Sequence, residues 1–314
     1  MKVLVTGAGG YIGRAVLRDL DAAGHTPVAA IRDPARLPLR WRPQALAVGD
    51  LGPETDWAAA LAGVDAVVHL AGPTAPDGFA ESDLDRMIVD GSKRLAESAA
   101  AAGVRRFVFV SSVKAAADIT PITGLDETAP PAPADAYGRS KLAAERAVAA
   151  VAAPGFGVAV LRPAPVYGPG SGGNLRRMID VLRTAPPVLP LGIAGNRRSF
   201  LHRDNLCGAI LACLDHPEAE GRTFFVTDGE ALSTAELSRR ILDAHGRRAL
   251  LLPVPALGLR ALGARGRRLG GSAVYDASAL RRVIGWKPVV DPRAGMVEAV
   301  RQTDDPLLAA ADET

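Results

Sequence analysis

The chain begins with a short apolar run that passes through three evenly spaced glycines into an amphipathic stretch. Residues 2–6 (KVLVT) have the composition of a buried strand, and residues 11–24 have the periodicity of a helix. The glycines between them, Gly7, Gly10 and Gly13, are three residues apart. Glycine is favoured where φ is positive and where an anion approaches the N–H groups of a helix N-terminus. The first 24 residues therefore predict a tight strand-to-helix turn, a phosphate-binding loop, or both.

The alternation of strand and helix continues through the first half of the chain. Further predicted strands lie at 26–32, 45–51, 65–72, 105–112, 157–168 and 222–229, and further predicted helices at 57–63, 89–103, 137–153, 175–185 and 197–217. Apolar runs without strict alternation are typical of strands that helices cover on both faces. The sequence therefore predicts a doubly wound α/β fold with a parallel (Rossmann) sheet. In that context the glycine turn indicates a dinucleotide site, although its GxxGxxG spacing differs from GxGxxG.

The pattern loosens after Gly168, where loops and helices prevail. We expect residues 1–167 to form the dinucleotide-binding domain, with residues 198–228 returning to it. Residues 168–197 and 229–314 are expected to form a smaller, mainly C-terminal substrate lobe.

Composition and charge argue against several classes of protein. The net charge is +3 and no run of like charges exceeds two or three residues, so a nucleic-acid partner is not supported. No apolar run reaches about 18 residues, the length of a membrane span, and no signal peptide is evident, so we expect a cytoplasmic protein. Cys207 and Cys213 are expected to be buried free thiols, because about 9 Å of helical rise separates them. No cluster of residues resembles a metal site.

A tyrosine and a lysine four residues apart, Tyr137 and Lys141, open the helix that follows a proline-rich loop. This spacing places both side chains on one helix face, where an ammonium favours the phenolate and lowers the tyrosine pKa from about 10 toward neutral. Such a pair also arises by chance on an exposed helix. A strand ending in Ser111 and Ser112 precedes Tyr137, and its hydroxyl could polarise the same substrate oxygen. Together these residues predict general acid/base chemistry.

Eight motifs follow the order found in one known family. They are TGAGGYIG, GDL, HLAG, FVFVSS, YGRSK, LRPAPVYGPG, RRSFLHRDN and IGWKP, and they span nearly the whole chain. The sequence thus resembles the epimerase/dehydratase branch of the extended short-chain dehydrogenase/reductase family. The resemblance implies that Ser112, Tyr137 and Lys141 form the catalytic triad. It also implies a cofactor site that contains Gly7, Gly10, Tyr11, Ile12, Gly13, Asp50, Leu51, Leu70, Ala71, Gly72 and Pro163, together with Tyr137 and Lys141.

The residues after the second predicted strand bear on the choice of cofactor. A carboxylate about 20 residues after the glycine turn would bind the ribose 2′-OH and select NAD. The chain has Ile31 and Arg32 there, and a guanidinium suits a 2′-phosphate. Asp33 could serve NAD if the loop bends. We therefore expect NADP, with NAD as the alternative.

Within the family, the sequence is most similar to bacterial nucleotide-sugar 4-epimerases and 4-keto-sugar reductases. This similarity implies a nucleoside-diphosphate sugar as substrate, and the candidates to bind it are Ser112, Asn174, Arg198 and Arg268. The alternative for each of the last three is an ordinary surface residue. Two departures are expected to alter the substrate pocket, because Ile88 and Pro165 stand where many relatives carry Asn.

The function expected from these features is an NAD(P)-dependent oxidoreductase that acts at C4 of a nucleotide sugar, as a 4-keto-sugar reductase. The first alternative is a UDP-hexose type 4-epimerase, which removes hydride from C4 and returns it to the other face. The others are a reductase of a non-sugar ketone and a non-catalytic NADP sensor. The intact Tyr137 and Lys141 speak against the sensor. A homodimer is also expected.

Overall fold

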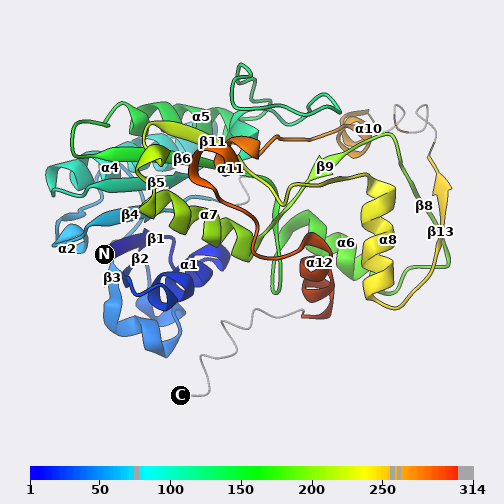
Figure 1. Cartoon of the computed structure of the whole chain (residues 1–314), viewed down its shortest axis with the longest axis horizontal. Helices are drawn as coiled ribbons and strands as arrows, with labels where there is room; N and C mark the ends of the chain where they lie inside the picture. The colour runs from blue at the N-terminus through cyan, green and yellow to red at the C-terminus, as the bar shows by residue number, and fades with distance from the viewer. Residues whose placement is uncertain (74–77, 255–258, 260–262, 303–314) are drawn as a thin grey trace.

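In the computed structural model, residues 1–73, 78–254, 259 and 263–302 are described. Within them, seven parallel strands form one sheet in the order β11-β6-β5-β4-β1-β2-β3 (Figure 1). The strands are β1 (Lys2–Thr6), β2 (Thr26–Ile31), β3 (Ala45–Ala47), β4 (Ala66–His69), β5 (Arg106–Val110), β6 (Gly157–Pro163) and β11 (Arg222–Val226). The strand order reverses between β1 and β4, so the predicted doubly wound parallel sheet is confirmed.

Helices cover both faces of this sheet (Figure 1). The helices that belong to this part are α1 (Tyr11–Ala22), α2 (Ala58–Leu61), α3 (Glu81–Leu84), α4 (Gly91–Ala101), α5 (Ala136–Ala149), α7 (Arg203–Asp215) and α11 (Ser278–Ile284). Side chains on β1 alternate between the faces: Val3 and Val5 join the core under α1 and α7, and Leu4 joins the core under α4 and α5. Because both faces of the sheet are buried, the sequences of the strands are continuous apolar runs instead of alternating patterns.

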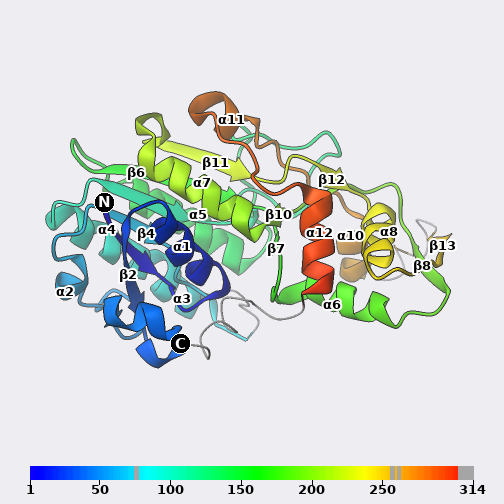
Figure 2. The same cartoon turned by 60° about the horizontal axis from the view of Figure 1, so that its bottom comes forward.

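A smaller lobe lies beyond the carboxyl edge of the sheet (Figure 2). Its elements are α6 (Gly173–Arg183), α8 (Thr234–Ala244), α10 (Gly263–Gly270), α12 (Pro292–Arg301), β8 (Val188–Gly192), β12 (Ala231–Leu232) and β13 (Leu250–Pro253). Its apolar core includes Ile179, Ile241 and Met296, one each from α6, α8 and α12. The short strands β7 (Val166–Tyr167), β9 (Arg198–Ser199) and β10 (Leu201–His202) join the lobe to the sheet.

Several predicted elements are longer than those observed, and two of them differ most in their extent. The single strand expected at 157–168 divides at Ala164 and Pro165, and β7 pairs with β10 instead of continuing in the main sheet. The helix expected at 197–217 begins only at Arg203, because the backbone N–H of Asp204 donates to the His202 ring and the residues before it are extended. Proline removes a ladder donor, which accounts for the break at residue 165.

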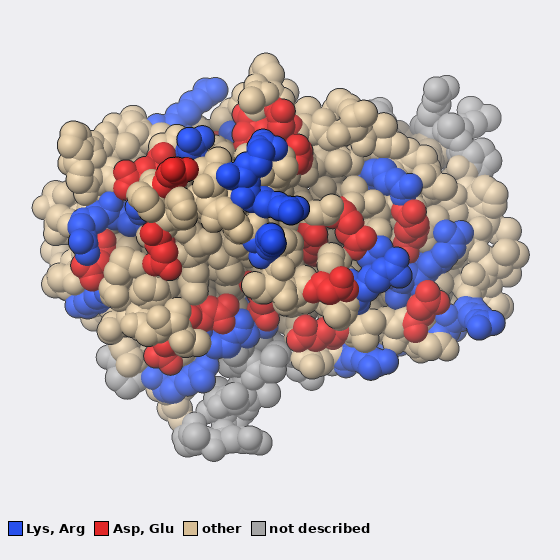
Figure 3. Space-filling model, in the orientation of Figure 1, with Lys and Arg blue, Asp and Glu red and all other residues tan. Residues whose placement is uncertain are grey.

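Cys207 and Cys213 are buried and unpaired in α7, as predicted. On the face drawn in Figure 3, basic and acidic side chains are interspersed rather than gathered into one basic patch. Among the helices that the structure describes, none is long and apolar enough to cross a membrane.

Candidate active site

The glycine turn lies at the carboxyl end of β1, where the strand order reverses. Gly7 has a φ of +67°, and a Cβ on it would lie 3.0 Å from the backbone nitrogen of Ala71. A Cβ on Gly13 would lie 2.2 Å from the carbonyl oxygen of Gly7. Gly10 caps α1 without a side-chain hydrogen bond to its first turn. The predicted tight turn is confirmed, and its uncapped helix N-terminus fits the pyrophosphate of a dinucleotide.

The end of β4 supplies the opposite wall of this cradle. The Thr6 hydroxyl oxygen accepts hydrogen bonds from the backbone N–H groups of Leu70 and Ala71, both at 3.2 Å. His69 contacts Thr6 Oγ1 at 2.6 Å and Ser92 Oγ at 2.8 Å. Burial lowers the pKa of His69 to about 3, so its ring is neutral and belongs to the core.

Two of the residues predicted to bind the cofactor, Arg32 and Asp50, lie side by side. Arg32 follows β2, and its guanidinium lies 3.4 Å from a carboxylate oxygen of Asp50. Both side chains are mostly exposed, at 70% for Arg32 and 88% for Asp50. Asp33 caps the short helical turn that follows β2. Leu51 is partly buried against the core under α4 and α5.

Two further predicted cofactor residues follow the turn directly, and a third lies on a strand that is separated from β1 by two others in the sheet. Tyr11 and Ile12 form the start of α1, and the Arg203 guanidinium lies over the Tyr11 ring at 4.9 Å from its centroid. Pro163 ends β6, the strand next to β5 in the sheet.

Helix α5 presents Tyr137 and Lys141 at its N-terminal end. The Asp135 side chain caps this helix by accepting the Gly138 N–H at 2.8 Å. Tyr137 packs partly buried against the core, and Lys141 Nζ lies 6.0 Å from the Tyr137 ring centroid. The predicted shared face is therefore present.

Lys141 is almost fully buried beneath the cradle. Its Nζ donates a hydrogen bond to the carbonyl oxygen of Val110 at 3.2 Å and lies 5.1 Å from the Phe109 ring centroid. A Cβ on Gly72 would lie 3.8 Å from this Nζ, so the ammonium also borders the segment after β4. Burial lowers the pKa of Lys141 to about 8.

Ser112 lies at the end of β5, in a turn that packs on the start of α5. Its Oγ accepts the backbone N–H of Lys114 at 3.2 Å, which leaves the hydroxyl hydrogen able to donate outward. A Cβ on Gly138 would lie 2.4 Å from the Lys114 carbonyl oxygen. The close packing of the two segments brings Ser112 and Tyr137 to the same edge of the sheet.

The expected lowering of the tyrosine pKa is wrong for this structure. Burial, together with the negative charge of Asp135, raises the pKa of Tyr137 to about 12. The sequence reveals the spacing to Lys141 but neither the burial of the phenol nor the carboxylate at the helix cap. Tyr137 therefore holds its proton at neutral pH and is set up to donate it.

Apart from Ser112, the predicted substrate residues lie in the lobe or in the short strands that join it to the sheet. Arg198 is on β9, donates to the carbonyl oxygen of Gly271 at 3.1 Å, and has its pKa lowered by burial. Asn174 is exposed in the first turn of α6. Arg268 belongs to α10, but its side chain lies outside the described part of the chain.

The two positions expected to alter the substrate pocket lie in different surroundings. Ile88 is only 1% exposed and packs in the core under α4 and α5. Pro165 is exposed, and its carbonyl oxygen accepts the N–H of Leu201 at 3.1 Å.

Sequence reasoning missed the charged groups around the triad. The Lys114 ammonium forms an ion pair with Asp135, lies 3.6 Å from Asp118, and lies 5.9 Å from the Tyr137 ring centroid. The sequence contained one indication of a nearby positive charge, because Lys114 is only two residues after Ser112.

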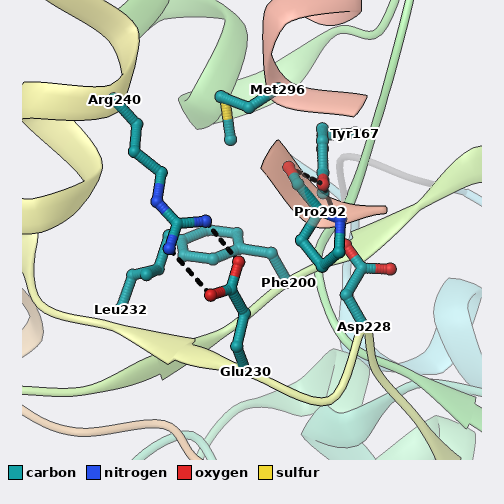
Figure 4. Close-up of a pocket in the computed structure, with 8 residues that line it drawn as sticks. All are labelled: Tyr167, Phe200, Asp228, Glu230, Leu232, Arg240, Pro292 and Met296. Atoms are coloured by element: carbon teal, nitrogen blue, oxygen red, sulfur yellow. Dashed lines mark hydrogen bonds and ion pairs between the residues drawn. The ribbon is translucent and has the colours of Figure 1, made fainter. Parts of the chain in front are cut away.

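A separate small pocket in the lobe is lined by residues of β7, β12, α8 and α12 (Figure 4). Its lining includes Tyr167, whose hydroxyl donates to Asp228 at 2.9 Å, and the ion pair of Arg240 with Glu230. None of the residues predicted for the cofactor or for acid/base catalysis lines it.

Comparisons with known proteins identify the family and its relatives. Residues 3–226 match the model of the NAD dependent epimerase/dehydratase family. The chain is 32% identical to a UDP-glucose 4-epimerase of Vibrio cholerae, covering 98% of this chain and 96% of that protein. It is 35% identical to a 3-diazoavenalumate denitrifying reductase of a Streptomyces species, covering 92% and 96% respectively. A solved structure of MoeE5 with UDP-glucose and NAD is 27% identical, with a TM-score of 0.76 over 96% of this chain and 98% of that one.

Proposed function

The chain belongs to the NAD-dependent epimerase/dehydratase family, and from this premise we propose that it acts at C4 of a nucleotide sugar as a 4-keto-sugar reductase. The observation that carries the oxidoreductase chemistry is the convergence of three polar side chains at one sheet edge. Ser112 follows β5, Tyr137 and Lys141 lie at the start of α5, and the Lys141 ammonium borders Gly72 after β4, so a ketone and a dinucleotide can meet between them.

Each of the three side chains has a distinct role in ketone reduction. When bound, a reduced nicotinamide cofactor supplies the hydride. Tyr137 donates its proton to the ketone oxygen, and the burial that raises its pKa to about 12 keeps that proton in place beforehand. Ser112 donates a hydrogen bond to the same oxygen as charge develops on it. Lys141 carries positive charge that stabilises the phenolate left on Tyr137.

The lobe offers groups suited to a diphosphate. Helix α6 begins at Gly173 without a side-chain cap, and the exposed Asn174 lies in its first turn. Ser171, just before the helix, has a buried hydroxyl without a hydrogen-bond partner in the described residues. An uncapped helix N-terminus favours an anion, and the guanidinium of Arg198 adds charge-assisted donors. The solved complexes of MoeE5 with UDP-glucose and with UDP-glucuronic acid support a nucleotide sugar as substrate.

The choice of NADPH, and with it of a reductase, rests on Arg32. Its exposed guanidinium lies just after β2, where a carboxylate would select NAD, and one of its nitrogens lies 3.4 Å from a carboxylate oxygen of Asp50. An exposed pair of this kind contributes little, so Arg32 can turn to a 2′-phosphate at small cost.

Replacing Arg32 with Ala is expected to weaken NADPH binding by roughly 1.5–3 kcal/mol, the scale of hydrogen bonds to a charged group. NADH binding should barely change, because that cofactor carries no 2′-phosphate. Fluorescence titration of the two nicotinamides against wild type and variant measures both affinities.

Arg105→Ala is the matched control. Arg105 is equally exposed, at 70%, and pairs with Asp65 at 3.0 Å, but it lies at the amino edge of the sheet. Equal losses for NADPH and NADH in Arg32→Ala, or a loss in Arg105→Ala as well, would remove the NADP assignment.

A 4-epimerase is the second candidate. It is favoured by the Vibrio cholerae relative, which is named as a UDP-glucose 4-epimerase and matches over 98% of this chain. It also accords with the NAD in the MoeE5 complexes. An epimerase retains its cofactor through the cycle, whereas a reductase exchanges it at every turnover, and this difference separates the two experimentally.

A further inference from the structure

A buried ionic cluster lies directly behind the active-site lysine. Glu145 is one helical turn after Lys141 on α5, and its carboxylate is only 5% exposed. Arg162 on β6 donates to both of its oxygens, from Nε at 3.0 Å and from a terminal nitrogen at 2.6 Å. The hydroxyl of Ser111, at the end of β5, donates to the same carboxylate. Each of these side chains is buried, and the carboxylate has three fixed donors.

This geometry matters because Lys141 needs a counter-charge. A buried ammonium tends to lose its proton unless an opposite charge lies near it. The titratable groups that face it are the neutral His69 from β4, the protonated Tyr137 from the preceding turn of α5, and Glu145. Of these, Glu145 carries the negative charge. Its charge opposes the effect of burial on the Lys141 pKa.

We propose that Glu145 is a positioning residue, fixed by Arg162 and Ser111, that keeps the buried Lys141 ammonium charged and in place beside Tyr137. The carboxylate touches neither substrate nor cofactor in this role. It acts through Lys141, and its bonds to β5 and β6 tie the lysine face of α5 to the strand that ends at Ser112. The mechanistic consequence rests on the proposed function, but the charge state of Lys141 can be measured without substrate or cofactor.

The chain is well suited to such a measurement because it contains five lysines: Lys2, Lys93, Lys114, Lys141 and Lys287. Protein labelled with carbon-13 at the lysine ε-carbon gives one signal for each, and Lys141→Met assigns the buried one. In wild type, the Lys141 signal should titrate near pH 8. Glu145→Gln keeps the shape of the side chain but removes its charge. In this variant the midpoint of the Lys141 titration should fall by about one pH unit or more.

Glu97→Gln is the matched control. Glu97 also stands in an i,i+4 pair with a lysine, 3.7 Å from Lys93, but both side chains are about half exposed. Loss of the Glu97 charge should leave the titration midpoint of every lysine nearly unchanged, because exposed ion pairs contribute little free energy. If Glu145→Gln does not fold, the double variant Glu145→Gln/Arg162→Met also removes the unpaired buried charge. The Lys141 midpoint should still fall in it, but by less, because a buried cation is lost together with the carboxylate.

An unchanged Lys141 midpoint in either folded variant would overturn the proposal. The activity readout is separate. The alkaline limb of the kcat profile should move to lower pH in Glu145→Gln, because activity is lost as pH rises through the Lys141 pKa. A shifted lysine titration without a shifted kcat limb would contradict the role assigned to Lys141 in the proposed function while leaving the Glu145–Lys141 coupling intact.

Discussion

Replacing Tyr137 with Phe is expected to lower kcat by at least about 10²-fold, the usual scale for a lost acid or base. The phenol is the partly buried proton donor of the site, and its raised pKa keeps it protonated at neutral pH. The ring that packs against the core is retained in the variant, so cofactor affinity should change little. Steady-state oxidation of reduced nicotinamide, together with a fluorescence titration of cofactor binding, measures the two effects separately.

Tyr167→Phe serves as the control for this experiment. The Tyr167 hydroxyl is also buried and donates to Asp228 at 2.9 Å, but it lies in the lobe pocket rather than at the sheet edge. Its loss should cost stability of about 1 kcal/mol and leave kcat nearly unchanged. Turnover like wild type in Tyr137→Phe would remove Tyr137 from the mechanism.

Replacing Gly13 with Val is expected to abolish most cofactor binding. A Cβ at this position would lie 2.2 Å from the carbonyl oxygen of Gly7 and 2.7 Å from Ala8 Cα, both backbone atoms that cannot rotate away. The turn must open, and the backbone N–H groups at the start of α1 then no longer point toward the pyrophosphate oxygens. Loss of two such charge-assisted hydrogen bonds raises the Kd by at least about 100-fold.

Gly195→Ala is the control for the glycine turn. Gly195 is exposed in the lobe, its φ is not positive, and a Cβ there meets nothing within 4 Å. This variant should bind cofactor as wild type does. Nearly normal NADPH and NADH affinities in a folded Gly13→Val would contradict the placement of the cofactor at the glycine turn.

Local sequence patterns predicted most of the framework of the site. The strand, glycine turn and helix at residues 2–24 follow from hydrophobic periodicity and from the conformational freedom of glycine. The shared face of Tyr137 and Lys141 follows from a spacing of four on a helix. These features depend on residues close together in the chain, so the sequence alone was enough to predict them.

The groups that set the charge of the site could not be predicted in the same way. Arg162 reaches Glu145 from a different element, 17 residues along the chain. The raised pKa of Tyr137 depends on burial and on Asp135, whose role as a helix cap places its charge beside the ring. The burial of Ile88 could not be predicted either, since only the packing of the whole sheet shows that it is a core residue.

The most direct test of the proposed function is the fate of the nicotinamide in a single experiment. The purified protein is analysed for bound cofactor and then mixed with NADPH and a 4-keto nucleotide sugar. As a reductase, it should carry little cofactor and oxidise one NADPH for each nucleotide sugar that gains a C4 hydroxyl. Arg32 should make NADPH a better cofactor than NADH. Tightly held NAD⁺, with interconversion of two C4 epimers and no net oxidation of NADPH, would contradict the reductase and establish the epimerase instead.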